Sequence, residues 1–351
     1  MNRFNLNHSK ILITGGTGSW GHELTRQLLE KYPHVEEIRI YSRGEHRQVR
    51  MKQEFYSTNK LKFIIGDVRD KNILHYAMKD IDVVFHLAAL KHVPVCEENS
   101  WEAVLTNISG TQNVIEAAIN NNVKKVIDVS TDKAVDPFNL YGITKACGEK
   151  LMINANFNYS YQKEFLPSFI CIRAGNVIGT NGSVIPLFKR QLSENNEITV
   201  TDPTMTRFLM STKEAIGLIF AAAENSIGGE LFVMRMPGTT VEIIAKAMIK
   251  LFGNKKSKIK TIGRRAGEKK HEVLVSKNES PFTHALSDKY FVILPQAKYG
   301  IFENIYKKYP HIGIEEFSSS STKQLSEKDL EKILVKEEWL WEKDKISLKN
   351  E

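Results

Sequence analysis

The chain has 351 residues, which is long enough for one large α/β domain and a smaller portion, with a core that needs no disulfide or metal for stability. Lysine and arginine number 49 against 41 aspartates and glutamates, and the net charge of +8 favours an anionic ligand, while the dispersal of the basic residues argues against nucleic-acid binding. The three cysteines have no C-x-x-C spacing, which argues against a thiolate metal site. The polar first residues argue against a signal peptide, and the lack of an apolar run of about 20 residues argues against a membrane span. We therefore expect a cytoplasmic protein with no metal and no membrane partner.

Short β-branched runs alternate with longer amphipathic stretches over residues 1–175, which predicts a Rossmann-like, doubly wound parallel sheet. Strands are expected near Lys10–Thr14, Glu37–Tyr41, Lys62–Ile65, Val83–Leu87, Lys125–Val129 and Phe169–Ile172. Helices are expected over Leu24–Lys31, Trp101–Asn120 and Tyr141–Asn156. The predicted fold is therefore α/β, with residues 1–175 as the nucleotide-binding domain.

The first expected strand runs into a glycine-rich turn and then into a helix. Glycine suits this turn because a side chain at Gly16 or Gly18 would block the approach of a pyrophosphate to the backbone. A plain glycine-rich turn is the alternative, but the position between strand and helix favours a dinucleotide site. The expected cofactor residues here are Gly15, Thr17, Gly18, Ser19, Trp20 and Gly21.

The end of the second expected strand lacks the acidic residue that usually holds the ribose of NAD. It reads Tyr41-Ser42-Arg43-Gly44-Glu45-His46-Arg47. Arg43 and Arg47 are suited to bind a 2′-phosphate, with Ser42 beside them, and this predicts NADP. Two solvated arginines, with Glu45 facing the ribose, are the alternative.

Two further strand ends add to the expected cofactor site, because ligands of open α/β sheets bind at the carboxyl ends of the strands. Asp67 and Val68 follow the third strand and are expected near the adenine. The small Ala88 and Ala89 follow the fourth strand and leave room for the ribose and nicotinamide.

Tyr141 and Lys145 follow the fifth expected strand and are four residues apart, so they share one face of a helix. The positive charge of Lys145 is expected to lower the pKa of the Tyr141 phenol. A phenolate then takes a hydroxyl proton while hydride moves to a nicotinamide. A surface pair is the alternative, but the position after the fifth strand favours a catalytic pair.

The regular alternation of strand and helix segments ends after Arg173, where glycine, asparagine, serine and proline become frequent. A smaller substrate-binding α/β portion is expected over residues 176–295. A helix near Lys213–Glu224 and a strand near Glu230–Met234 are regular enough to return to the main sheet, so the two portions are expected to interleave. Residues 296–351 are expected to form a charged, partly ordered extension bound at the surface, including the run Glu327–Lys345.

The motifs together resemble those of a known family. Gly15-x-x-Gly18-x-x-Gly21, Asn107, Thr131, Tyr141 and Lys145 resemble the pattern of the extended short-chain dehydrogenases/reductases. The stretches Ala88–Pro94, Ser130–Ala134, Arg173–Val177, Met205–Phe208 and Gly267–Glu272 resemble the UDP-N-acetylglucosamine 4,6-dehydratases of bacterial pseudaminic acid and capsular polysaccharide synthesis. The resemblance extends over Lys10 to Leu294, and the run Ser-Thr-Asp-Lys-Ala is its most specific part.

The resemblance implies a lyase that recycles its NADP. Oxidation at C4 of the sugar makes the C5 proton acidic, and loss of water across C5 and C6 then needs a base and an acid. By the resemblance, Lys133 is the C5 base and Asp132 is the acid for the C6 hydroxyl, whereas a salt-bridged loop pair is the alternative. The remaining implied roles are Tyr141 as the C4 base, Lys145 as its electrostatic partner, Thr131 as a hydrogen-bonding positioner and Asn107 as a cofactor residue.

The resemblance also implies UDP-N-acetylglucosamine as the substrate, inversion at C5 and a homo-oligomer, either a dimer or a hexamer. The implied substrate residues are Lys91, Asn176, Ser183, Val184, Arg207, Arg265 and Glu268, and guanidinium groups suit a diphosphate. The chain departs from the family pattern at Ala174, where relatives often have an aromatic residue, and at Ala266, where proline is usual. These departures bear on the identity of the substrate more than on the reaction.

Two other functions fit the sequence. A UDP-sugar 4-epimerase or reductase of the same fold would have no use for Asp132 and Lys133. A non-catalytic protein that senses NADP would tolerate Tyr141→Phe without loss of function.

Overall fold

The computed structural model describes residues 4–159, 166–180, 183–265 and 267–337, which form two compact units. Unit 1 comprises residues up to Ala174, Ile216–Arg235 and Val275–Glu315. Unit 2 comprises Gly175–Ala215, Met236–Leu274 and the residues from Glu316 onwards. The departure noted at Ala266 lies outside the described residues.

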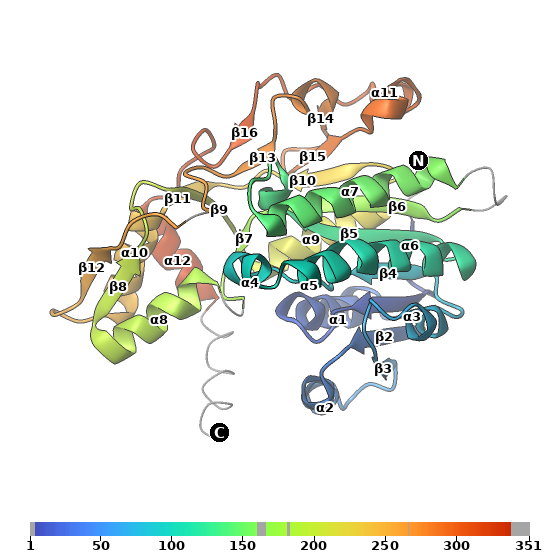
Figure 1. Cartoon of the computed structure of the whole chain (residues 1–351), viewed down its shortest axis with the longest axis horizontal. Helices are drawn as coiled ribbons and strands as arrows, with labels where there is room; N and C mark the ends of the chain where they lie inside the picture. The colour runs from blue at the N-terminus through green and yellow to red at the C-terminus, as the bar shows by residue number, and fades with distance from the viewer. Residues whose placement is uncertain (1–3, 160–165, 181–182, 266, 338–351) are drawn as a thin grey trace. The chain divides into compact units, whose positions relative to one another are not determined.

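Unit 1 is built on a nine-stranded sheet with the order β14-β15-β10-β6-β5-β4-β1-β2-β3 (Figure 1). Its strands are β1 (Lys10–Thr14), β2 (Glu37–Ser42), β3 (Leu61–Ile65), β4 (Val83–His86), β5 (Lys125–Thr131), β6 (Ser168–Ala174), β10 (Leu231–Met234), β14 (Thr283–Ala285) and β15 (Tyr290–Ile293). All neighbouring pairs from β3 to β10 are parallel, and β15 is antiparallel to β10. The order 3-2-1-4-5-6 is that of the Rossmann fold, so the predicted fold class is confirmed.

The six predicted strands of the first 175 residues match β1 to β6 within one or two residues at each end. The central strands β1 and β4 are nearly continuous apolar runs because helices cover both faces of a parallel sheet. The segment near Glu230–Met234 forms β10, which pairs in parallel with β6 in the main sheet.

The helices of unit 1 follow the predicted segments, with one interruption. They are α1 (Ser19–Lys31), α2 (Glu45–Glu54), α3 (Lys71–Ala77), α4 (Val93–Glu98), α5 (Ser100–Val104), α6 (Gly110–Asn120), α7 (Leu140–Asn158), α11 (Tyr299–Tyr306) and most of α9 (Thr212–Asn225), with short turns η2 (Asp132–Ala134), η3 (Ser280–Phe282) and η4 (Gln296–Lys298). The helix predicted over Trp101–Asn120 is divided into α5 and α6 by a π-helical turn, η1 (Leu105–Ser109). In Figure 1, α6 and α7 lie side by side over the sheet, and α7 packs on β5 and β6.

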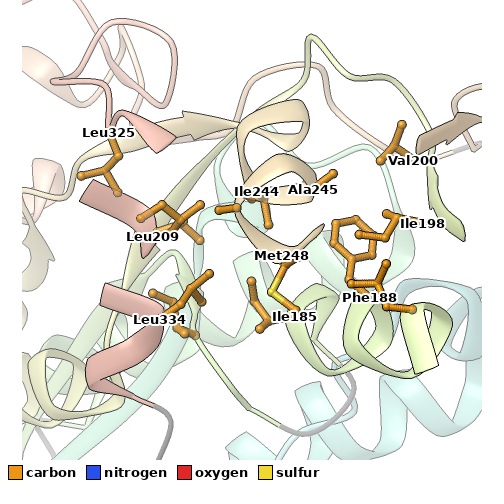
Figure 2. Close-up of a cluster of buried hydrophobic side chains, with 14 residues drawn as sticks. Ile185, Phe188, Ile198, Val200, Leu209, Ile244, Ala245, Met248, Leu325 and Leu334 are labelled. Atoms are coloured by element: carbon orange, nitrogen blue, oxygen red, sulfur yellow. The ribbon is translucent and has the colours of Figure 1, made fainter. Parts of the chain in front are cut away.

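The described residues of unit 2 form small sheets and several helices. Its elements are β7 (Asn176–Val177), α8 (Val184–Asn195), β8 (Glu197–Val200), β9 (Thr206–Met210), β11 (Gly238–Thr240), α10 (Val241–Phe252), β12 (Lys258–Thr261), β13 (Val273–Val275, whose last residue belongs to unit 1), β16 (Phe317–Ser318) and α12 (Glu327–Lys336). The strands pair as β11-β9-β7, β12-β8 and β13-β16. Figure 2 shows the apolar core, in which Ile185 of α8, Met248 of α10 and Leu334 of α12 lie close together.

The predicted boundaries of the later segments are wrong. Residues 275–295 belong to unit 1 rather than to a substrate-binding portion, because β15 extends the main sheet and buries Val292 and Ile293. The described part of the extension 296–351 is not one surface segment, since residues 296–315 belong to unit 1 and residues 316–337 to unit 2, while residues 338–351 lie outside the described residues. Within it, α12 buries Leu330 and Leu334 in the core of unit 2. The apolar spacing of α12 is hidden in the sequence by its many charged neighbours.

None of the helices within the described ranges has the length and apolar character that a membrane span requires. Over the same ranges, no three histidine, cysteine, aspartate or glutamate side chains are grouped as a metal site would need.

Candidate active site

The glycine-rich turn joins β1 to α1 at the carboxyl edge of the main sheet. Gly15 has a φ of +66°, and a Cβ there would lie 2.9 Å from the backbone of Ala88. A Cβ at Gly21 would lie 2.1 Å from the carbonyl oxygen of Gly16. The fold itself therefore requires both glycines, because the turn passes so close to the end of β4 and to α1.

The first turn of α1 is suited to an anion. Its N-cap is Gly18, no side chain caps it and it carries no acidic residue, so its N–H groups stay available for a phosphate. Thr17, Ser19 and Trp20 are half-buried around the turn. These residues fit the pyrophosphate of a dinucleotide.

At the end of β2, Ser42 is buried and its hydroxyl accepts a hydrogen bond of 3.1 Å from Gln48. Arg43 and Arg47 are exposed, and Arg43 lies 3.8 Å from the carboxylate of Asp67. Two guanidinium groups thus stand beside the carboxyl end of β2, as a 2′-phosphate site would need.

Asp67 is already engaged within the protein. Arg69 donates to it at 2.9 and 2.6 Å. Burial works against the charged carboxylate, but the hydrogen bonds from Arg69 and the charges of Arg69 and Arg43 together lower the pKa of Asp67. Its neighbour Val68 is buried, so both residues that follow β3 are held in place by contacts within the protein.

Asn107 lies in the π-helical turn η1 and is buried. Its amide oxygen accepts from the backbone N–H of Leu90 at 2.8 Å, and its amide nitrogen donates to the carbonyl of Leu90 at 2.9 Å and to Thr144 at 3.0 Å. Asn107 therefore holds the segment after β4, with the half-buried Ala88 and Ala89, against helix α7.

Tyr141 and Lys145 lie in the first two turns of α7 and are both buried. Burial raises the pKa of Tyr141, while the charges of Lys145 and Lys133 and a hydrogen bond with Thr131 act to lower it. Lys145 therefore lowers this pKa as predicted, although the net direction in the ligand-free chain is upward. The predicted effect of the lysine exists, but loss of water around the phenol outweighs it.

Asp132 and Lys133 follow β5 in the turn η2, next to Tyr141. One oxygen of Asp132 accepts from the Thr131 hydroxyl and from the Lys133 ammonium, each at 3.0 Å. The other oxygen is buried and has no hydrogen-bond partner among the described residues. A Cβ at Gly142 would lie 2.2 Å from the carbonyl oxygen of Lys133, so the turn packs directly on the start of α7. The structure thus brings a carboxyl, an amine and a phenol together.

A residue that the sequence analysis missed is Asp128, in the middle of β5. Its carboxylate oxygens lie 3.3 and 3.4 Å from the Lys145 ammonium, and it is fully buried. The available signal was an acidic residue in the otherwise apolar run Val126-Ile127-Asp128-Val129.

The predicted substrate residue Lys91 is exposed in the segment after β4 of unit 1. The other six lie in unit 2. Asn176 is in β7, and Ser183 is the N-cap of α8, directly before Val184. The amide oxygen of Asn176 and the hydroxyl of Ser183 are buried without a hydrogen-bond partner in the part of the chain that the structure describes. Such atoms are costly to bury unless a ligand satisfies them.

The remaining predicted residues form a polar group in unit 2. Arg207 of β9 donates to the carbonyls of Thr206 at 2.7 Å and Lys270 at 3.3 Å. Arg265 is exposed, and its backbone N–H donates to Glu268 at 3.4 Å. Unit 2 therefore contains the guanidinium groups of Arg207 and Arg265 in addition to the buried polar atoms that have no hydrogen-bond partner among the described residues.

The strand order and the glycine-rich turn place the protein in the short-chain dehydrogenase/reductase fold class. The model of a family described as polysaccharide biosynthesis protein matches residues 11–294, and the chain belongs to this family.

Named relatives carry two different activities. A UDP-glucose 4-epimerase of Rickettsia akari is 43% identical over 340 residues, covering 95% of this chain and 97% of that protein. A UDP-N-acetylglucosamine 4,6-dehydratase (inverting) of Campylobacter jejuni is 44% identical over 293 residues, covering 83% and 84%.

Solved structures support the fold. Pen from Bacillus thuringiensis is similar with a TM-score of 0.86 at 36% identity, covering 95% of this chain and 100% of that one. The dTDP-glucose 4,6-dehydratase DesIV from Streptomyces venezuelae, solved with NAD bound, has a TM-score of 0.65 at 22% identity, covering 74% and 86%, and shows likeness of fold alone.

Proposed function

We propose that the protein is an NADP-dependent UDP-N-acetylglucosamine 4,6-dehydratase that inverts C5 and forms a UDP-4-keto-6-deoxy-N-acetylhexosamine for bacterial surface-glycan or nonulosonic acid synthesis. The observation that carries this proposal is the contact between Asp132 and Lys133 next to Tyr141. A 4-epimerase needs only the phenol, whereas dehydration needs an additional acid and base. The relative from Campylobacter jejuni carries this activity in its name.

The residues for the cofactor follow from the turn geometry. The first turn of α1 and Gly18 hold the pyrophosphate, and Arg43 and Arg47 hold the 2′-phosphate that distinguishes NADP from NAD. When bound, NADP would supply the hydride acceptor for oxidation at C4 and the hydride donor for reduction at C6. The reduction also needs one proton at C5, which balances the proton that Tyr141 takes from the C4 hydroxyl. Tyr141 accepts the proton of the C4 hydroxyl, and the ammonium of Lys145 stabilises the phenolate.

The elimination follows from the protonation of the Asp132–Lys133 pair. As an ion pair, the carboxylate and the ammonium are in the wrong states to act as acid and base. Transfer of one proton along the 3.0 Å contact gives a neutral amine and a carboxylic acid. Lys133 then takes the C5 proton, and Asp132 protonates the departing C6 hydroxyl, which leaves as water. The ion pair is thereby restored, and no proton is lost or gained by the pair.

For the substrate, we propose that Asn176, Arg207 and Arg265 hold the diphosphate, and that Ser183 and Val184 contact the uridine end. Their unsatisfied polar atoms and guanidinium groups suit an anionic nucleotide. Lys91 and Glu268 complete the proposed set, and a homo-oligomer is the proposed assembly.

A second candidate is a UDP-sugar 4-epimerase, because a relative with that name matches 95% of this chain. The two candidates give different products. The NADP-loaded chain is incubated separately with UDP-N-acetylglucosamine and with UDP-glucose, and the products are weighed by mass spectrometry. Loss of one water from UDP-N-acetylglucosamine supports the dehydratase. Isomers of unchanged mass from either sugar support the epimerase, and absence of any turnover supports a non-catalytic protein.

A further inference from the structure

Three neighbouring strands place titratable side chains in one row beneath helix α7. The parallel register pairs His86 of β4 with Asp128 of β5, and Asp128 with Cys171 of β6. All three are buried, with exposures of 1%, 0% and 0%. The ammonium of Lys145 contacts the central member of this row, Asp128.

The two outer members of the row are neutral. His86 hydrogen bonds with Thr14 at 2.7 Å and with Thr111 at 3.3 Å, and burial lowers its pKa to about 4. Burial raises the pKa of the Cys171 thiol well above its usual value. Burial acts to lower the pKa of Lys145, and among the neighbouring groups that raise it, Asp128 contributes most, ahead of Tyr141 and Cys171.

The stability of the fold does not by itself explain the buried ion pair between Asp128 and Lys145. A buried ion pair costs so much desolvation that an apolar pair of similar size often serves equally well. The pair lies one helical turn from Tyr141, the phenol that the proposed reaction uses. The chemistry of that phenol is a stronger reason for the buried carboxylate.

We propose that Asp128 is a positioning residue that fixes the place and the charge of the Lys145 ammonium beside Tyr141. This inference rests on the proposed function for its kinetic consequences, but its effect on Lys145 exists without substrate. Burial acts to lower the pKa of Lys145, and the charge of Asp128 reverses that direction. When a neutral residue replaces Asp128, the negative charge that counteracts burial is lost, and we expect Lys145 to lose its proton at a lower pH.

The test compares Asp128→Asn with the wild type at several pH values. Single-turnover formation of reduced nicotinamide from NADP-loaded enzyme and UDP-N-acetylglucosamine reports the oxidation at C4. Because the ammonium must stay protonated, we expect the alkaline loss of rate to move down by about 1–3 pH units. Asp128→Ser gives a second neutral variant should the asparagine fail to fold. Glu230→Gln, another buried carboxylate in unit 1, is the matched control and should leave the profile unchanged.

Two further measurements separate positioning from a merely structural role. In a Lys145→Met background, Asp128→Asn should cause no additional loss of rate. Carbon-13 NMR of lysine-labelled, ligand-free protein, assigned with Lys145→Met, should show Lys145 titrating about 1–3 units lower in Asp128→Asn.

An unchanged lysine titration, or an equal loss of rate with and without Lys145, would overturn the inference. Should the wild type give no keto product, the proposed function fails, while the ligand-free titration still decides the role of Asp128.

Discussion

The two units hold their candidate functional residues in different ways. In unit 1, Asp132, Tyr141 and Lys145 are buried and contacted by other protein groups, so the proposed catalytic arrangement exists before any ligand binds. In unit 2, Asn176 and Ser183 bury polar atoms that lack partners among the described residues, and Arg265 is exposed. Under the proposed function, the catalytic groups of unit 1 are preorganised, whereas the substrate-binding groups of unit 2 gain their hydrogen-bond partners only when the ligand binds.

The largest expected effect is on the stability of unit 1, through the buried ion pairs of one arginine. Arg173 of β6 is buried and donates to Glu149 of α7 at 2.9 and 2.7 Å and to Glu279 at 2.8 Å. Arg173→Met leaves the buried carboxylate of Glu149 and the half-buried carboxylate of Glu279 uncompensated, and we expect a loss of about 3–5 kcal/mol in the free energy of unfolding. Urea denaturation measures it, with the exposed Arg50→Ala as control. A loss no larger than that of the control would show that α7 is held by other means.

A somewhat smaller effect is expected in the core of unit 2. Leu334 of α12 is 1% exposed, whereas its neighbour Val335 is 54% exposed. Leu334→Ala should cost about 2–5 kcal/mol because it removes buried methyl groups and leaves a cavity. Val335→Ala is the matched control and should cost less than about 0.5 kcal/mol. Equal losses for the two variants would mean that α12 is not part of this core.

A smaller effect still is expected at the cofactor. Arg43→Ala should weaken NADP binding by about 1.5–3 kcal/mol, because it removes a charged hydrogen bond to the 2′-phosphate. Binding of NAD should not change, since NAD lacks that phosphate. Isothermal calorimetry with both dinucleotides measures the difference, and Arg50→Ala again serves as control. Equal losses for NADP and NAD would reject the 2′-phosphate assignment.

Much of the fold could be predicted from the sequence because its signals are local. Strands β1 and β4, for example, are apolar runs buried along almost their whole length, without a polar alternation. The spacing of Tyr141 and Lys145 likewise depends only on helical geometry. The π-helical turn at Asn107 left no such signal, since it follows from hydrogen bonds to Leu90 and Thr144 that are formed only in the folded chain.

The remainder depends on which segments pack together. Strand β15 joins the main sheet although it follows unit 2 in the chain, and no local pattern records that pairing. The net direction of the Tyr141 pKa could not be predicted from the sequence for a related reason. The lysine was visible in the sequence, but the degree of burial of the phenol was not.

The most direct test of the account is the fate of the C5 hydrogen. In heavy water, the wild-type chain with NADP should convert UDP-N-acetylglucosamine to a product that lacks one water and carries deuterium at C5, as read by NMR. Lys133→Ala should bind NADP with unchanged affinity and form none of this product. An isomer of unchanged mass without deuterium, or wild-type turnover in Lys133→Ala, would contradict the proposed dehydration.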